Sequence, residues 1–148
     1  MSSVSRSPSE MADALAAGDA SAVDEAITYL ERDPWEFRSG YAKATLLRRL
    51  KHVELTGAQI ARLERVLLRY VDVGLRWDFR EACTLARRIE TRSLPDALRE
   101  RLRATDVGVA LRALTMLLGL RRPSLSWACW MLARRTPRST GRPLTTVR

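Results

Sequence analysis

The chain has 148 residues, enough for one domain with one hydrophobic core. Its 46% hydrophobic and 29% charged residues are ordinary for a soluble globular protein, and the dominance of Ala, Leu, Arg and Glu favours an all-α fold. No apolar run reaches the ~20 residues of a membrane span, and no secretory signal is visible. The two cysteines have neither CxxC nor metal-site spacing, so we expect a reducing, cytoplasmic location.

The net charge of +9 is spread unevenly. Residues 1–33 hold two basic and seven acidic residues, a net of −5, whereas residues 92–148 hold twelve basic and three acidic residues, a net of +9. Arg outnumbers Lys by 24 to 2, a bias that a GC-rich genome also produces. The charge therefore predicts a basic protein with an acidic N-terminal part, and only weakly indicates polyanion binding.

Two helices are predicted before residue 35. The sequence SPSE from Ser7 is typical of a capped helix start, and Gly18 ends that helix. Asp19 and Ser21 begin the next helix, which Pro34 ends because the residue before a proline is disfavoured in the α conformation.

The middle of the chain predicts three further helices. The sequence WEFRSGYAKATLLRRL opens one at Trp35, and WDFREACTLARRIETR opens another at Trp77. Between them, the helix 57–73 has an apolar face and an opposite face that carries Arg62, Arg65 and Arg69.

The sequence SLPD from Ser93 predicts another capped helix, and Thr105 or Asp106 caps a strong helix that runs to about Leu120. We expect one helical domain over residues 1–120. Residues 121–148 change in composition and are interpreted as a terminal helix with a basic, disordered tail, as a basic arm that touches membrane or nucleic acid, or as an out-of-frame end.

The two Trp-containing stretches recur as part of a longer repeat. Aligning Trp35 with Trp77 matches Phe37 with Phe79, and the following helices match at an offset of 39, which pairs Arg62 with Arg101. A helix–turn–helix unit with a period of about 40 residues resembles HEAT and armadillo repeats over residues 35–105. The resemblance implies stacked antiparallel helical hairpins, seven or eight helices in all, and carries no functional residues across.

Such a repeat needs large apolar groups at equivalent positions, because each helix pair must stack on its neighbour. We therefore interpret Trp35, Phe37, Trp77 and Phe79 as packing anchors. A functional site made of these aromatic rings and the adjacent arginines is the alternative.

No motif in the sequence carries recognisable chemistry. The single histidine, His52, has no nucleophile or carboxylate at catalytic spacing, and the glycines form no phosphate loop. We predict no catalytic residue, no metal, no cofactor, no small-molecule substrate and no enzyme activity. The predicted role is a non-catalytic interaction module that binds a protein partner.

The alternative is a nucleic-acid-binding protein, with a helical-repeat DNA-processing enzyme as a weaker third option. It depends on a surface that stacked helices could align into one arginine ridge. The candidate residues are Arg62, Arg65, Arg69, Arg80, Arg87 and Arg88.

Overall fold

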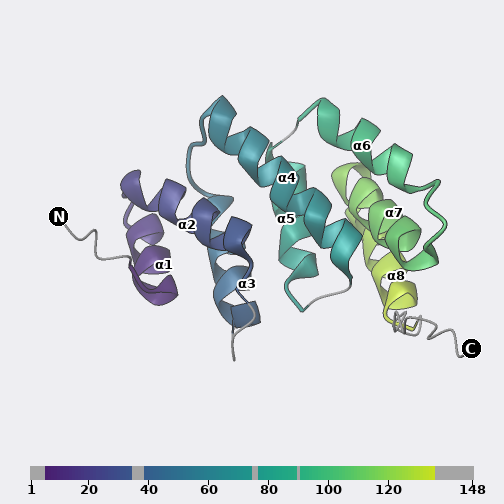
Figure 1. Cartoon of the computed structure of the whole chain (residues 1–148), viewed down its shortest axis with the longest axis horizontal. Coiled ribbons are helices and arrows are strands. Elements are labelled where there is room, and N and C mark those ends of the chain that lie inside the picture. The colour runs from purple at the N-terminus through teal and green to yellow at the C-terminus, as the bar shows by residue number, and fades with distance from the viewer. Residues whose placement is uncertain (1–5, 35–38, 75–76, 90, 136–148) are drawn as a thin grey trace, which may run out of the picture.

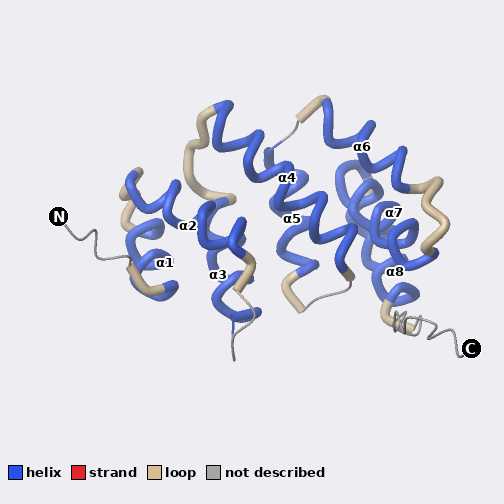
Figure 2. Tube along the Cα trace, viewed as in Figure 1, coloured by secondary structure: helices blue, strands red, loops and turns tan. Residues whose placement is uncertain are grey.

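A computed structural model describes residues 6–34, 39–74, 77–89 and 91–135 of the chain. This part contains eight α-helices and no strand, as Figures 1 and 2 show, and confirms the all-α prediction. The helices are α1 (Pro8–Ala16), α2 (Ser21–Arg32), α3 (Ser39–Leu50), α4 (Gly57–Val73), α5 (Phe79–Ile89), α6 (Ser93–Arg101), α7 (Val107–Arg121) and α8 (Pro123–Ala133).

The helices stack in two rows. Helices α1, α3, α5 and α7 follow one another in one row, and α2, α4 and α6 form the second row against it (Figure 1). Helix α8 packs against α7, so that α1 lies at one end of the stack and α7 and α8 lie at the other. One continuous apolar core lies between the rows and is built from α1 to α7.

Predicted helix boundaries have the expected physical causes. The Oγ of Ser7 accepts a hydrogen bond from the backbone N–H of Glu10 at 3.3 Å, and the Glu10 carboxylate accepts one from the N–H of Ser7 at 2.7 Å. Asp106 caps α7 by accepting from the N–H of Gly108 at 2.7 Å. Gly74 ends α4 with a φ of 137°, which a residue with a side chain rarely adopts.

The start of α6 differs from its prediction. Ser93 is the first helical residue and does not cap the helix; its Oγ instead donates to Glu64 of α4 at 2.8 Å. The Oγ1 of Thr91 accepts from the N–H of Leu94 at 3.2 Å. The hydroxyl that accepts a hydrogen bond from the N-terminus of α6 thus belongs to Thr91, two residues before the predicted cap at Ser93.

The helices pair differently from the helix–turn–helix units that the sequence predicts from Trp35 and Trp77. No Cα atom of α3 lies within 8 Å of one in α4, and none of α5 approaches α6 that closely, whereas α4 approaches α5 and α6 approaches α7. An alternating series of helices can be divided into pairs in two ways, and the sequence alignment does not choose between them. The consecutive helices with close backbones are α1–α2, α2–α3, α4–α5, α6–α7 and α7–α8.

The predicted packing anchors differ in how deeply they are buried. Phe79 is fully buried, as a packing anchor must be. The prediction for Trp77 is wrong: its side chain is 71% exposed, because α5 begins only at Phe79 and the indole lies outside the first turn. There it contacts the exposed ring of Tyr41 from α3, with 6.1 Å between ring centroids. Trp35 and Phe37 lie outside the described residues.

The acid of the second Trp-containing stretch has a structural role that the sequence reading missed. Asp78 is buried and accepts a hydrogen bond from the hydroxyl of Tyr70 in α4, which links the end of α4 to the start of α5. A second buried polar contact holds α2 to α3, where Lys43 donates to Asp33 at 2.6 Å. Both pairs satisfy polar groups that would otherwise be buried at a cost.

Candidate functional site

The structure places the six arginines of the predicted ridge on two helices. Helix α4 belongs to one row of the stack and α5 to the other. Arg62 and Arg69 of α4 are half-buried against α2, while Arg80 and Arg87 of α5 lie beside α7 and α8. The arginines of α4 and those of α5 therefore contact different helices of the stack.

The two half-buried arginines of α4 hold the stack together. Arg62 binds both carboxylate oxygens of Glu31, at 3.0 and 2.7 Å, and it also donates to Asp24 at 3.0 Å. Its hydrogen bonds lower the pKa of Glu31. Arg69 donates to the backbone carbonyl oxygens of Leu30 and Glu31, both at 2.7 Å, and thereby satisfies the C-terminus of α2.

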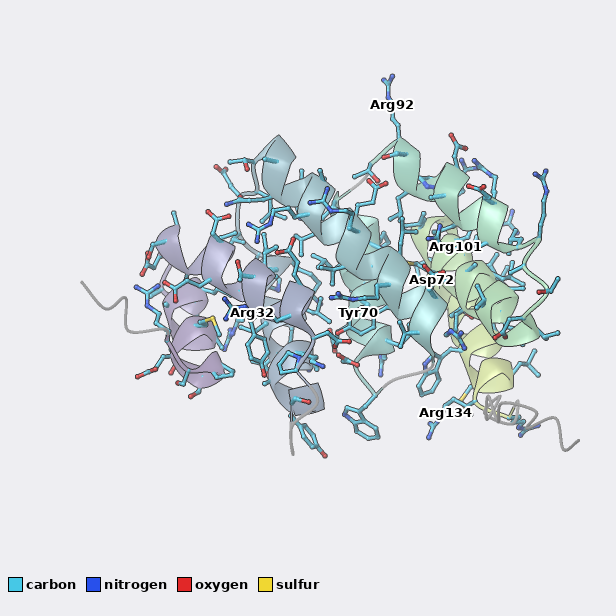
Figure 3. All side chains as sticks on the ribbon, viewed as in Figure 1. Arg32, Tyr70, Asp72, Arg92, Arg101 and Arg134 are labelled. Atoms are coloured by element: carbon cyan, nitrogen blue, oxygen red, sulfur yellow. The ribbon has the colours of Figure 1, made fainter. Side chains whose placement is uncertain are left out.

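A comparable ion pair joins α6 to α4, and an arginine of α7 also reaches the end of α4. Arg101 of α6, which the sequence alignment pairs with Arg62, binds both oxygens of Asp72, at 2.7 and 2.9 Å (Figure 3). Asp72 is the penultimate residue of α4, as Glu31 is of α2. Arg112 of α7 donates to the carbonyl oxygen of Val71 at 2.7 Å, near the end of α4. Arg62, Arg69, Arg101 and Arg112 thereby couple helices that lie side by side in the stack.

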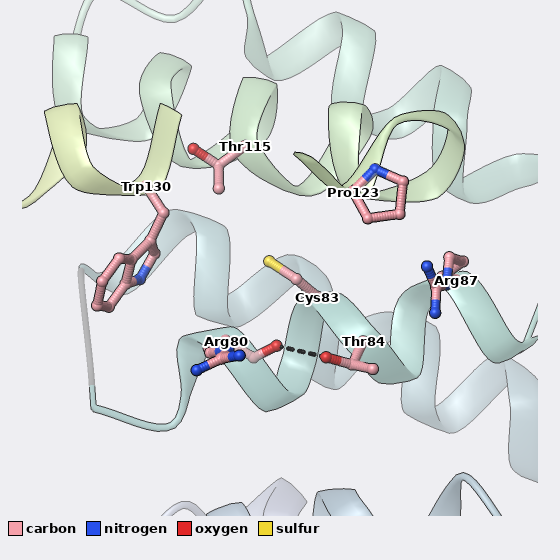
Figure 4. Close-up of a pocket in the computed structure, with 8 residues that line it drawn as sticks. Arg80, Cys83, Thr84, Arg87, Thr115, Pro123 and Trp130 are labelled. Carbon is pink, nitrogen blue, oxygen red and sulfur yellow. Dashed lines mark hydrogen bonds between the residues drawn. The ribbon is translucent and has the colours of Figure 1, made fainter. Parts of the chain in front are cut away.

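A cleft between α5, α7 and α8 is the best candidate site in the described part of the chain (Figure 4). Its volume is about 280 Å³. The lining residues come from three helices, and none of those described is acidic: Arg80, Cys83, Thr84, Arg87, Thr115, Gly119, Pro123 and Trp130.

The inner surface of the cleft is apolar in character. Cys83, Thr115 and Gly119 are buried, and Trp130 closes one side. The hydroxyl of Thr115 donates to the carbonyl oxygen of Leu111 in its own helix at 2.7 Å. Thr84 donates in the same way to the carbonyl oxygen of Arg80 at 2.9 Å. The hydroxyl protons of both threonines are thus directed to the backbone of their own helices.

Burial raises the pKa of the Cys83 thiol to about 12. The thiol is therefore protonated at neutral pH and acts as an apolar group of the cleft, because only the thiolate is a strong nucleophile. The structure offers no support for a nucleophilic role of this side chain.

The outer edge of the cleft is positively charged. Arg80 and Arg87 are exposed and lie two helical turns apart on α5. The neighbouring acid, Glu81, is paired instead with Arg48 at 3.2 Å and Lys51 at 3.6 Å on α3. The described lining of the cleft contains no carboxylate.

Helix α8 presents a second surface at the same end of the stack. Leu125, Met131 and Leu132 are exposed by 46%, 43% and 59%, and along the backbone α8 approaches only α7. The exposed side of α1 at the other end carries the polar residues Ser9, Glu10 and Asp13. The two ends of the stack therefore differ in chemistry.

A larger hollow of about 490 Å³ lies between the α1–α2 turn and the end of α3. It includes His52, but its charges are mixed, since Asp19 and Glu54 face it together with Arg49. Asp19 is moreover paired with Arg6 at 2.9 Å. The charged residues that line this hollow are of both signs, whereas those that line the cleft are all basic.

Sequence reasoning found Arg80 and Arg87 but missed the other residues of the cleft. They come from α5, α7 and α8, and no local spacing shows that these helices meet. No helix of the described ranges combines the length and the apolar character of a membrane span. Comparisons with protein-family models, with curated proteins and with solved structures found no match to this chain.

Proposed function

We propose that the protein is a non-catalytic helical interaction module that binds a protein partner at the α8 end of its stack. The observation that carries the proposal is the exposed apolar side of α8, formed by Leu125, Met131 and Leu132. Stacked helical repeats are normally closed by a terminal unit with a polar outer face. Helix α1 fits that rule at one end, and α8 does not fit it at the other.

The partner contributes apolar side chains that cover α8, as a further helix of the stack would. Exposed apolar groups of this kind are typical of protein interfaces, where a few large side chains supply most of the binding free energy. The HEAT-like assignment is part of the same proposal. It is supported by the two helix rows and by the recurring contacts of Arg62 and Arg101.

The internal contacts of Arg62 and Arg69 weigh against the nucleic-acid alternative. A phosphate that approached either side chain would have to compete with hydrogen bonds of 2.7 Å to α2. The cytoplasmic location and the absence of enzyme activity stay predictions.

The test is capture of partners from an extract of the native host, with and without nuclease. We expect a protein to be retained in both samples and to be lost with the double variant Leu125→Ser/Leu132→Ser. The matched control is Val107→Ser, which changes a side chain that is 66% exposed at the start of α7. Retention that disappears with nuclease would refute the proposal in favour of nucleic acid, and equal capture by all variants would refute the role of α8.

A further inference from the structure

We propose that the cleft between α5, α7 and α8 is a binding site for an uncharged aromatic molecule of one or two fused rings. The exposed apolar residues of α8 are not among those described in its lining, so the site is separate from the proposed protein interface. The size of the cleft and the chemistry of its inner wall select the ligand, and the charge at its edge does not.

The cleft is a gap in the packing between α5 and α8. In the described ranges no Cα atom of α5 lies within 8 Å of one in α8, although both helices pack against α7. Protein interiors are otherwise close-packed, with few voids larger than a water molecule. The space of about 280 Å³ is lined by residues of all three helices. A ligand in this space would therefore contact α5 and α8 at once and complete the packing between them.

The inner part of the wall that α5 and α7 form is apolar or already hydrogen-bonded. Because burial raises the pKa of Cys83 to about 12, its thiol stays protonated and acts as a small apolar group. Gly119 brings no side chain into the space. The hydroxyls of Thr84 and Thr115 donate to carbonyl oxygens of their own helices, at 2.9 and 2.7 Å. A charged ligand group placed here would lose its hydrogen bonds to water without replacement.

The volume and the α8 side of the cleft favour a planar ring. An apolar cavity of about 150 Å³ holds a benzene ring, so a space of about 280 Å³ suits one or two fused rings. Figure 4 shows the indole of Trp130 on one side of the cleft and the ring of Pro123 on the other, with the Sγ of Cys83 between them. Arg134 lies over the Trp130 ring, 4.7 Å from its centroid, and helps to hold it in place. An aromatic ligand can pack against this indole in an offset or edge-to-face arrangement.

The charge at the edge of the cleft does not select an anion. Of the two arginines that line the cleft, Arg80 already has an interaction in the structure. Arg87 is exposed, but exposed arginines also lie elsewhere in the chain, among them Arg32, Arg65 and Arg103. An anion would be attracted to those arginines as well, whereas a cation would be repelled at the edge of the cleft. An uncharged ring has neither disadvantage.

Fluorine NMR titrations with fluorinated indoles test the site on the full chain. The probes are 5-fluoroindole and three derivatives of similar size, which are neutral 5-fluorotryptophol, cationic 5-fluorotryptamine and anionic 5-fluoroindole-3-acetate. We expect 5-fluoroindole to bind saturably with a Kd of about 0.1–1 mM, as suits so small a ligand. The tryptamine should bind more weakly than the tryptophol, because it brings a cation close to two arginines. The acetate should bind less than about tenfold more tightly than the tryptophol, because an exposed ion pair contributes little.

Two matched threonine variants locate the site. Thr84 lines the cleft and Thr45 of α3 does not, but both are half-buried and both donate to the carbonyl oxygen four residues earlier, at 2.9 Å. Thr84→Phe fills part of the cleft and should weaken binding of 5-fluoroindole by at least about tenfold. Thr45→Phe should change the affinity by less than about twofold. Circular dichroism melts verify that each variant is folded.

A second measurement needs no variant. Nuclear Overhauser effects between the protons of bound indole and the methyl groups of Thr84 and Thr115 should place the ring inside the cleft of the unmodified protein.

The proposal is overturned if 5-fluoroindole shows no saturable binding at millimolar concentration, if both threonine variants lose affinity equally, or if the Overhauser effects fall only on residues outside the cleft. Binding of the acetate more than about tenfold tighter than that of the tryptophol would reassign the cleft to anions. A tryptamine that binds as tightly as the tryptophol would contradict the position of the ring beside the arginines.

The cleft would instead receive a side chain of the protein partner if no indole binds while Thr84→Phe loses the protein that the unmodified chain captures. That result overturns the proposal of a small aromatic ligand and leaves the proposed function intact. Failure to capture any protein refutes the proposed function and does not bear on the indole titrations.

Discussion

Replacement of Phe79 by Ala tests whether the repeated aromatic motif serves packing. The side chain is fully buried in the core that joins the two helix rows. Removal of a buried phenylalanine ring costs about 3–5 kcal/mol, from lost apolar burial and from the cavity that remains. For a domain of this size, a loss of that order lowers the melting temperature by roughly 10 °C or more.

Replacement of Trp77 by Ala is the matched comparison two residues earlier. Its ring is 71% exposed, and the contact that the structure gives it is with Tyr41, at 6.1 Å and an interplanar angle of 55°. An exposed aromatic pair contributes no more than about 1 kcal/mol, so the variant should melt close to the parent protein.

Urea unfolding followed by circular dichroism at 222 nm measures both variants, with the slope of the transition used to verify that unfolding remains two-state. We expect Phe79→Ala to lose at least about three times as much stability as Trp77→Ala. Equal losses, or a larger loss for Trp77→Ala, would refute the assignment of packing to Phe79 and of exposure to Trp77.

Three further predictions follow from polar and buried groups. A double-mutant cycle of Arg62→Gln and Glu31→Gln should give a coupling of about 1 kcal/mol. Because Arg62 lowers the pKa of Glu31, this contribution to stability is present at neutral pH and is lost as the pH falls below about 4.5. The variant Arg62→Gln should therefore flatten the acid limb of the curve of stability against pH, and an unchanged limb would contradict the pairing. In mass-spectrometric alkylation at pH 8, Cys83 should react about a thousandfold more slowly than an ordinary thiol, since its pKa is raised to about 12, and rapid labelling in the folded protein would show that it is not buried. Tyr70→Phe removes a hydrogen bond to the buried carboxylate of Asp78 and should cost about 1–3 kcal/mol in urea unfolding, whereas a change below about 0.5 kcal/mol would mean that water or another donor replaces the hydroxyl.

Local sequence patterns were sufficient to predict where the helices of this protein lie. The predicted bounds of 57–73 coincide with α4 because an uninterrupted apolar period runs from Gly57 to Val73 and Gly74 ends it. The capping box at Ser7 and the cap at Asp106 were equally readable, since a cap joins residues only two or three positions apart. The alignment pairs Arg62 with Arg101, and in the structure each of them binds a carboxylate near the end of the preceding helix of its row.

The arginine ridge shows where local patterns fail. A helical pattern places Arg62, Arg65 and Arg69 on one side of α4, but it does not say whether that side meets solvent or another helix. In the stack α2 lies against it, and two of the three arginines satisfy the carboxylates and carbonyls of α2. For Trp77 the error is the opposite one, because a side chain predicted to be buried is exposed. A large apolar residue next to a helix start can still lie outside the first turn of that helix.

The positions of the helices and most of their ends follow from the sequence, because periodicity, caps and helix-ending glycines act over a few residues of chain. Which helices are neighbours, which arginines bind other helices, and that α5, α7 and α8 enclose a cleft follow from the folded arrangement. The reason is physical: burial and charge pairing depend on groups that lie dozens of residues away, as Arg62 does from Glu31 and Trp130 from Cys83.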